Sequence, residues 1–127
     1  MELEQVICQG IDDIYAIAGV LKEFQKAINE IWKTDPPWQR YQKKLICDLA
    51  VLEQEKERAV DFPQYEKLNG EDNLYSIRHP ESKKNVRVIY TFCNGNVILL
   101  TAFLEKNDAD YKRAIRKARK RLLWLRS

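Results

Sequence analysis

The chain has 127 residues, of which 45% are apolar and 32% are charged, and its formal net charge is +3. This length allows one sizeable hydrophobic core, and the apolar content excludes a disordered chain, so we expect a single domain spanning residues 1–127. No apolar run approaches the roughly 20 residues of a membrane-spanning helix, and the start lacks the pattern of a signal peptide. We therefore expect a cytoplasmic protein without membrane contact.

The positive charge is concentrated in the second half of the chain. Residues 1–63 contain 8 basic and 12 acidic residues, a net charge of −4, whereas residues 64–127 contain 14 basic and 7 acidic residues, a net charge of +7. A basic half favours an anionic partner such as nucleic acid. It is also compatible with an acidic protein partner or with a solvated surface.

Potential metal ligands and disulfide partners are sparse. Cys8, Cys47 and Cys93 are odd in number and show no Cys-x-x-Cys spacing, and His79 is the only histidine. We expect free thiols and no zinc site. The carboxylates also lack a paired spacing suited to magnesium, so neither a metal nor a cofactor is expected.

The first half of the sequence has a helical period. Apolar residues recur at three- and four-residue steps over residues 12–33, which predicts an amphipathic helix. Residues 34–37 break this helix, and a second helical pattern follows over residues 38–52. Phe62 and Pro63 end it, so an N-terminal helical hairpin is predicted.

Three strands are predicted next, because residues 74–78, 86–92 and 97–103 are rich in β-branched and aromatic side chains. Asn94 and Gly95 form a strong hairpin signal between the last two strands. An antiparallel meander is the simplest pairing. We therefore predict an α+β fold in which the helical hairpin packs on a three- to four-stranded antiparallel sheet.

A basic C-terminal helix completes the predicted fold, beginning near Asp110. Its apolar stripe consists of Tyr111, Ile115, Ala118, Leu122 and Leu125. Lysine and arginine dominate the other faces, so one stripe is expected to pack on the sheet while the rest meets solvent or an anion.

Three segments in order carry a family resemblance. Residues 74–78 read Leu-Tyr-Ser-Ile-Arg, residues 86–90 read Val-Arg-Val-Ile-Tyr, and residues 98–106 read Ile-Leu-Leu-Thr-Ala-Phe-Leu-Glu-Lys. Together with the order of the elements they resemble the RelE/ParE toxin superfamily, and most closely its HigB-like, phage-associated branch. The resemblance covers roughly residues 67–121, and residues 1–33 are interpreted as a possible N-terminal helical extension.

The resemblance implies a RelE-like toxin of a type II toxin-antitoxin system. Such a protein is expected to be a metal-independent endoribonuclease that cuts messenger RNA on the ribosome by 2′-hydroxyl attack and so inhibits translation. Its partners would be the ribosome, the message and a cognate antitoxin, expected to be a small helix-turn-helix protein. Two alternatives remain open: a ParE-like inhibitor of DNA gyrase, and a non-catalytic module that binds nucleic acid or antitoxin.

Cleavage of this kind requires a base, an acid and a cation that stabilises the phosphorane. The single imidazole excludes a two-histidine mechanism. By position in the family motifs, Arg87 is expected to grip the scissile phosphate, while Arg78 adds positive charge. Lys106 would act as acid or base, and Tyr111 would stack on a base or orient the 2′-hydroxyl unless it packs in the core.

Two further candidates have competing interpretations. Glu105 stands where the branch often has a lysine, and it is either a carboxylate base or an ion-pair partner. His79 precedes a proline in a predicted connector, where it is either a surface residue or close enough to reach substrate. Candidate contacts to RNA or the ribosome are Lys83, Lys84, Lys112, Arg113, Arg116 and Lys120.

Overall fold

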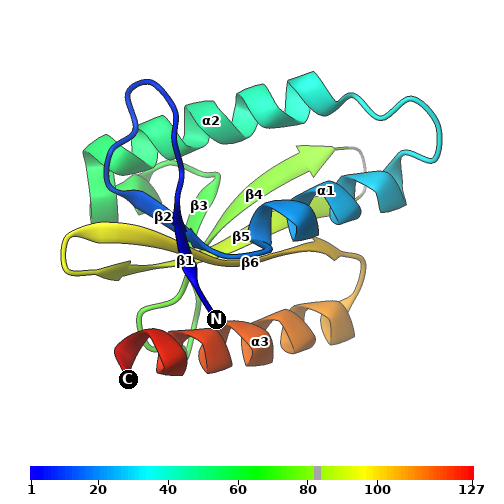
Figure 1. Ribbon diagram of the computed structural model, residues 1–127. Coiled ribbons are helices and arrows are strands. Elements are labelled where there is room, and N and C mark those ends of the chain that lie inside the picture. Colours follow the sequence, from blue (N-terminus) through cyan, green and yellow to red (C-terminus); the bar gives the residue numbers. More distant parts are fainter. Residues whose placement is uncertain (82–83) are drawn as a thin grey trace.

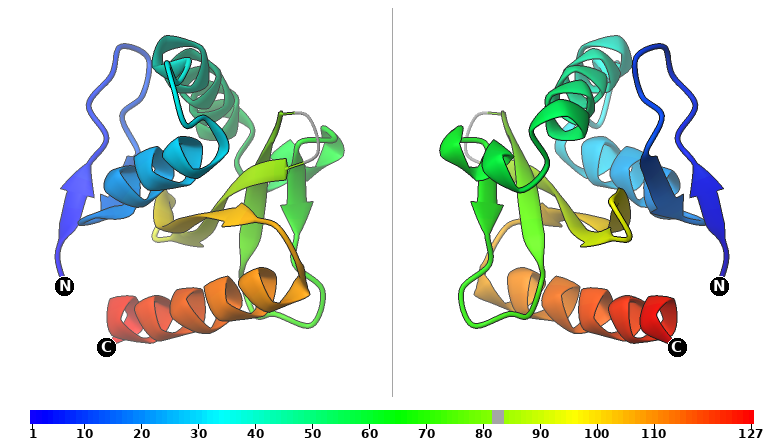
Figure 2. Two further views of the ribbon diagram at one scale, coloured as in Figure 1. Left: turned by 90° about the vertical axis from the view of Figure 1, so that its right-hand side faces the viewer. Right: turned by 90° about the vertical axis from the view of Figure 1, so that its left-hand side faces the viewer.

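The computed structural model describes residues 1–81 and 84–127, without the side chains of residues 80–84, and within them one mixed β-sheet lies between helices (Figure 1). The elements are, in chain order, β1 (Leu3–Gln5), β2 (Ile14–Ile17), α1 (Val20–Ile31), α2 (Trp38–Glu55), the 3-10 helix η1 (Lys56–Asp61), β3 (Tyr65–Lys67), β4 (Tyr75–Glu81), β5 (Lys84–Cys93), β6 (Asn96–Glu105) and α3 (Asp108–Arg126). Helices α1 and α2 cover one face of the sheet and α3 covers the other, as the side views show (Figure 2). The α+β class is confirmed.

The predicted meander is present in β4, β5 and β6, which pair antiparallel in sequence order. Its last turn is the Asn94-Gly95 pair, because Cys93 is the register partner of Asn96. Both turn residues have positive φ, 52° and 81°, which is the conformation that a tight type I′ hairpin requires. Asparagine and glycine tolerate that conformation better than other residues do, so the local prediction is correct.

The sheet is larger than predicted. It has six strands in the order β1-β2-β6-β5-β4-β3 among the described residues, and the prediction of three to four antiparallel strands is corrected. Strand β3 adds antiparallel to β4, and β1 adds antiparallel to β2. Strand β2 lies parallel to β6, which makes the sheet mixed.

The first predicted helix begins too early. The structure begins α1 at Val20, and residues 14–17 form strand β2 instead of helix. Ile14 and Ile17 fit a helical step, but they also fit a buried strand, and both are almost completely buried beside β6. Gly19, with φ of 98°, separates strand from helix. The helical pair therefore remains, but it is shorter and two strands precede it.

The other two helices follow the predicted pattern. In α2 the buried apolar side chains are Tyr41, Leu45, Leu49 and Leu52. In α3 the predicted stripe faces the sheet, with Ile115, Ala118 and Leu122 buried and Tyr111 and Leu125 half-buried. The Asn107 side chain accepts a hydrogen bond from the backbone N–H of Asp110 at 3.0 Å and caps the start of α3. This cap sets where the basic helix leaves the end of β6.

Candidate functional site

Strand register places the two predicted site arginines next to each other. Arg78 of β4 is directly opposite Arg87 of β5, so both side chains leave the same face of the sheet. Ser76 is two residues from Arg78 on β4, so alternation puts it on this face as well. Arg87 is paired with Phe103 of β6, and Glu105, two residues further along β6, therefore also lies on this face. This is the face that α3 covers (Figure 1). The predicted strand motifs thus converge on one surface.

Arg87 is buried on this face, with only 8% of the residue exposed. Its guanidinium interacts with a hydroxyl and with two carboxylates that neutralise its charge. Its Nε donates to Glu105 Oε1 at 3.2 Å, and its Nη1 donates to Ser76 Oγ at 3.3 Å. A second carboxylate, that of Glu66 on β3, is 3.7 Å from Nη1. A guanidinium buried to this degree needs such partners, because an unpaired charge away from water is costly.

Tyr111 lies over the same guanidinium. The Arg87 Cζ atom is 5.5 Å from the centre of the Tyr111 ring, within the range of a cation–π contact. Partial burial raises the pKa of the Tyr111 hydroxyl, and the nearby Arg87 charge acts in the opposite direction. The hydroxyl therefore stays protonated at neutral pH and can donate a hydrogen bond. Tyr111 packs from α3 against the core and also lies over Arg87, so the two sequence interpretations are compatible.

A pocket of about 460 Å³ opens beside these side chains. Its lining is mostly polar and consists of Glu66, Asn85, Arg87, Glu105, Lys106, Asn107, Asp108 and Tyr111. Asn85 Nδ2 donates to the same Glu105 oxygen that Arg87 uses, at 3.4 Å. A phosphate entering this pocket would compete with Glu105 for Nε and with Glu66 for Nη1 of Arg87. Glu66 is the more exposed of the two carboxylates.

Lys106 and Arg78 lie near the pocket. The partner of each side chain is a group other than those that hold Arg87. The Lys106 ammonium is 3.6 Å from Glu30 of α1, so the side chain turns away from Arg87 although the residue lines the pocket. Arg78 is half-buried, and its Nη2 donates to the Pro63 carbonyl at 3.4 Å. Lys106 stays a candidate acid or base at the rim, and Arg78 stays a candidate source of positive charge on this face.

The structure corrects the predicted position of His79. It belongs to strand β4 and not to a connector, and alternation turns it to the face opposite Arg78. Only 1% of it is exposed, its ring centre is 5.3 Å from that of Phe24, and its Nε2 is 3.6 Å from Asp48 Oδ2. Burial lowers the pKa of His79 to about 4, which the Asp48 charge only partly opposes. The imidazole is therefore neutral, enclosed and separated from the Arg87 pocket by the sheet.

The sequence model of one protein family, "Phage derived protein Gp49-like (DUF891)", matches residues 38–123. The chain belongs to this Gp49-like family. The family is of the RelE toxin type, so the toxin-like resemblance is confirmed, whereas the HigB-like branch stays a prediction. No curated protein and no solved structure matches the chain. The match leaves out residues 1–37, which contain β1, β2 and α1.

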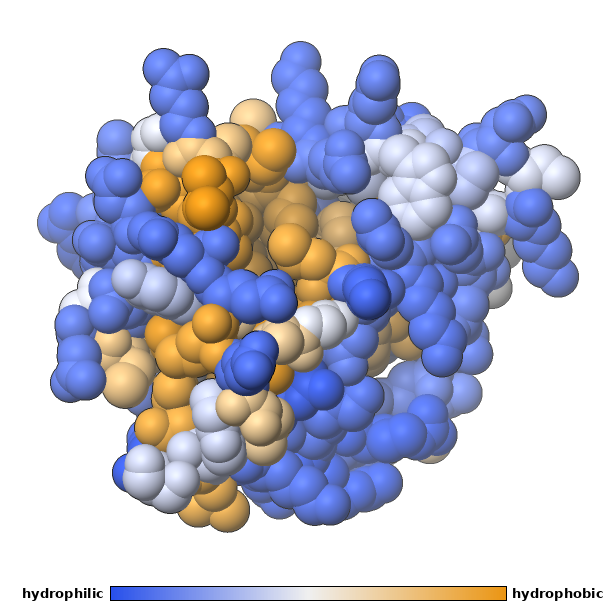
Figure 3. All heavy atoms as spheres, viewed as in Figure 1, coloured by the Kyte–Doolittle hydropathy of each residue, from blue (hydrophilic) through white to orange (hydrophobic). Residues whose placement is uncertain are grey.

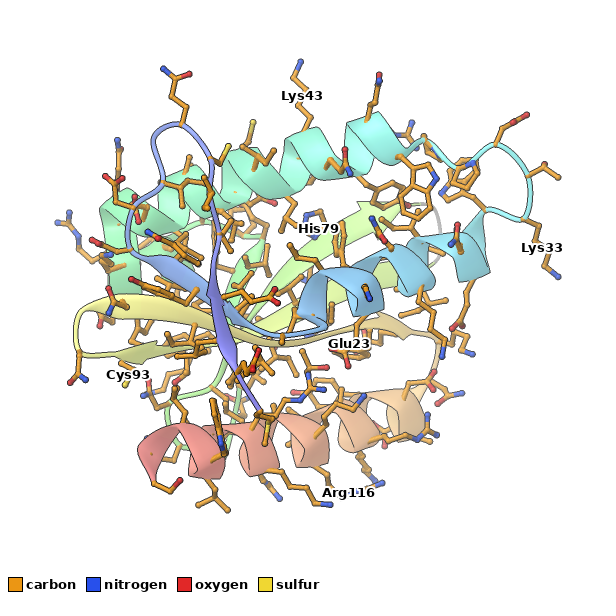
Figure 4. The ribbon with its side chains drawn as sticks, in the orientation of Figure 1. Glu23, Lys33, Lys43, His79, Cys93 and Arg116 are labelled. Carbon is orange, nitrogen blue, oxygen red and sulfur yellow. The ribbon has the colours of Figure 1, made fainter. Side chains whose placement is uncertain are left out.

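The basic helix of this Gp49-like protein carries part of its charge in local ion pairs. Lys112 pairs with Asp108 and Arg113 with Asp110, each at 3.2 Å. Both cations are solvent-exposed, so the pairs are weak. Arg116 and Lys120 are exposed, and Arg116 points away from the sheet (Figure 4). The surface over the first part of α3 is hydrophilic (Figure 3). Of the other predicted contacts, Lys83 and the side chain of Lys84 lie outside the described residues.

Three residues that contact Arg87 or its partner Glu105 were missed from sequence. Glu66 lies on β3, a strand too short to stand out as a pattern, and its charge reaches Arg87 only through pairing with β4. Ser76 and Asn85 each sit two residues from a predicted site arginine, so strand alternation was a usable signal for both. In the described parts of the chain, no group of three or more His, Cys, Asp or Glu could hold a metal ion, and no helix is long and apolar enough to cross a membrane.

Proposed function

We propose that this Gp49-like protein is the toxin of a type II toxin-antitoxin pair and that it cuts messenger RNA bound to the ribosome. The observation that supports this most is the buried Arg87 guanidinium, which faces a polar pocket between Glu105 and the Tyr111 ring. A toxin-type family implies an antitoxin partner, and the basic outer face of α3 suits RNA phosphates.

In the proposed reaction Arg87 binds two oxygens of the scissile phosphate, since a guanidinium offers two parallel N–H donors. Glu105, released from Arg87, takes the proton of the attacking 2′-hydroxyl. The bond between O2′ and phosphorus forms as the bond to O5′ breaks, which leaves a 2′,3′-cyclic phosphate and a 5′-hydroxyl. Arg87 compensates the charge that develops on the phosphorane.

The remaining side chains have supporting roles in this proposal. Lys106, at the rim of the pocket, protonates the leaving 5′-oxygen after exchanging Glu30 for substrate. Tyr111 presents its ring to a splayed base and its hydroxyl to the ribose. Arg78 adds positive charge on the same face. Among the described residues no imidazole reaches the pocket, so the proton transfers fall to a carboxylate and a lysine.

The test is to add purified protein to ribosomes programmed with a defined message and to map the new 5′ ends, with a DNA gyrase supercoiling assay in parallel. We expect cuts in phase with the codons for the wild type and for Arg58→Ala, which removes one exposed arginine of η1 outside the pocket and outside α3 as a matched control, and none for Arg87→Ala. A 2′-deoxynucleotide placed before the mapped cut should block cleavage at that position. Inhibited gyrase with an intact message would contradict the proposal, and activity in neither assay would favour a binding module.

A further inference from the structure

The lining of the Arg87 pocket has more carboxylates than cations. Glu66, Glu105 and Asp108 contribute three acids, whereas Arg87 and Lys106 contribute two cations. Phosphate oxygens are attracted by cations and repelled by carboxylates, so only part of this lining suits a phosphate group. The remaining part suits a ligand group that donates hydrogen bonds, because an ionised carboxylate can only accept them.

Of the two acids that neutralise Arg87, Glu66 has the more available oxygens. It lies opposite Ser76 in the register of β3 and β4, which places it on the same face as Arg87. Its Oε1 is 3.7 Å from Arg87 Nη1, longer than a hydrogen bond, and 42% of its side chain is exposed. The Glu105 side chain is 22% exposed and already accepts hydrogen bonds from Arg87 and Asn85. Glu66 can therefore accept N–H donors of a ligand without breaking a hydrogen bond to Arg87.

Binding of a phosphate changes what the Glu66 carboxylate needs. In the proposed reaction the Arg87 guanidinium turns its N–H groups to the phosphate, and its ion pair with Glu66 weakens. A partly enclosed carboxylate loses stability when its cation leaves, unless other donors replace that cation. An RNA ligand carries such donors on its bases.

The four bases differ in what they offer to the two oxygens of a carboxylate. Guanine presents two neighbouring donors, N1–H and N2–H, which match the two oxygens. Adenine and cytosine place an acceptor nitrogen beside their single amino group, and uracil flanks its one N–H with two carbonyl oxygens. An acceptor that faces a carboxylate is repelled, so guanine is the base that fits.

Tyr111 supplies the second group that a bound base requires. Its ring and the Glu66 carboxylate line the same pocket of about 460 Å³, a volume within the range of small-ligand sites. A base that stacks on this ring keeps its Watson–Crick edge available for hydrogen bonds, because stacking uses only the faces of the base. A stacking ring and a carboxylate acceptor are therefore both present next to Arg87.

We propose that Glu66 selects guanine at the message position bound in the Arg87 pocket, by accepting hydrogen bonds from N1–H and N2–H of the base. The scissile phosphate replaces Glu66 as a partner of Arg87, and guanine replaces Arg87 as the partner of Glu66. Neither charge is then left without a partner. The inference rests on the proposed function in naming the message as the ligand, whereas selective binding of a guanine nucleotide does not require cleavage.

The binding test titrates the full chain with the 3′-monophosphates of guanosine, inosine and 7-deazaguanosine and follows the complexes by NMR. Inosine lacks the N2 amino group, whereas 7-deazaguanosine keeps both donors and lacks only the N7 acceptor. We expect the inosine nucleotide to bind about tenfold more weakly than the guanosine nucleotide, because one hydrogen bond to a charged group is lost. The 7-deaza nucleotide should bind as well as the guanosine nucleotide. Equal binding of the guanosine and inosine nucleotides, or binding of neither at millimolar concentration, would overturn the proposal.

Two variants test whether the preference comes from this carboxylate. Glu66→Gln keeps the size of the side chain but replaces one acceptor oxygen with an amide donor, which would face a guanine N–H. The ratio of the inosine to the guanosine dissociation constant should therefore fall from about ten to about one. Glu4→Gln removes an exposed acid on β1, at the opposite edge of the sheet, and should keep the wild-type ratio. An unchanged ratio in Glu66→Gln would contradict the proposal, with thermal unfolding as the check on folding.

Message cleavage provides a separate test. On programmed ribosomes the wild type should cut a message with guanosine at the preferred position about tenfold faster than the same message with inosine there. Glu66→Gln should cut both messages at the same rate. A uniform loss of cleavage with an unchanged guanosine preference would assign Glu66 to proton transfer and overturn the inference. Guanine-selective binding without cleavage would contradict only the proposed function, whereas cleavage without a guanine preference would contradict only this inference.

Discussion

Arg78 and His79 are neighbours in the chain but belong to opposite faces of the sheet. Arg78 shares the α3 face with Arg87, beside a polar pocket that carboxylates and a tyrosine line. His79 points to the α1 and α2 face, where Phe24 and Asp48 enclose it. A titratable side chain therefore gains or loses access to substrate by a single step along a strand, and residue type alone does not reveal which.

Charged side chains also have different partners on the two faces of the sheet. On the α3 face Arg87 stays charged, because Glu105 and Glu66 neutralise it within reach of solvent. On the other face Asp48 is buried and holds a network, accepting from Lys44 at 2.9 Å and Gln64 at 3.4 Å, while its backbone carbonyl accepts from the Tyr65 hydroxyl at 2.6 Å. The first arrangement can exchange a partner for a ligand, whereas the second stabilises the packing of α2 on the sheet.

The largest expected effect lies on the α3 face. Arg87→Ala should lower the rate of message cleavage by about 100- to 1000-fold, the usual result of removing one donor that stabilises developing charge. Arg87→Lys should recover only a small part, because an ammonium lacks the planar pair of donors. Cleavage rates on programmed ribosomes check this, with thermal unfolding as the control for folding. A decrease below about threefold in Arg87→Ala would show that this face is not the reactive one.

The opposite face should control stability instead. The folded-state pKa of His79 is lowered to about 4 from an unfolded value of 6.5, so the unfolded chain binds the extra proton first as the pH falls. The stabilisation is complete above about pH 6.5 and decreases toward pH 4, by on the order of 3 kcal/mol. Urea unfolding at several pH values measures this decrease. His79→Gln should flatten the curve over that interval, and an unchanged slope would contradict the buried, neutral imidazole.

The contributions of the Tyr111 ring and of its hydroxyl can be measured separately. Tyr111→Ala should lower cleavage by about tenfold or more, since stacking of one base on an aromatic ring contributes about 1–3 kcal/mol. Tyr111→Phe keeps the ring over Arg87 and should cost less. Single-turnover rates of the two variants give the comparison. If Tyr111→Phe lowers the cleavage rate as much as Tyr111→Ala does, the hydroxyl and not the ring has the main role.

The smallest expected effect belongs to the outer surface of α3. Arg116→Gln combined with Lys120→Gln should weaken RNA binding modestly and should lower the slope of log affinity against log salt by about 0.7 for each phosphate that the helix no longer neutralises. The cleavage rate at saturating ribosomes should stay the same. Binding measured at several salt concentrations tests this, and an unchanged slope would mean that the two residues are simply solvated.

The sequence correctly predicted those parts of the fold whose residue pattern is compatible with only one type of secondary structure. The Asn94-Gly95 turn, the three meander strands and the apolar stripe of α3 each follow from local chemistry. Residues 14–17 are predicted as helix because two isoleucines three apart fit a helical step. In the structure they belong to a strand that is buried on both faces, which only its pairing with β6 reveals. Glu66 reaches Arg87 through contacts between distant segments, which local patterns do not contain.

The most direct measurement compares message cleavage by Arg87→Ala and His79→Gln on programmed ribosomes at pH 7.5, at equal concentrations of folded protein. The two residues lie on adjacent strands but on opposite faces of the sheet. We predict that Arg87→Ala is slower than the wild type by at least about 100-fold, while His79→Gln stays within about threefold of it. The reverse order, or equal decreases in both variants, would contradict the assignment of function to the α3 face.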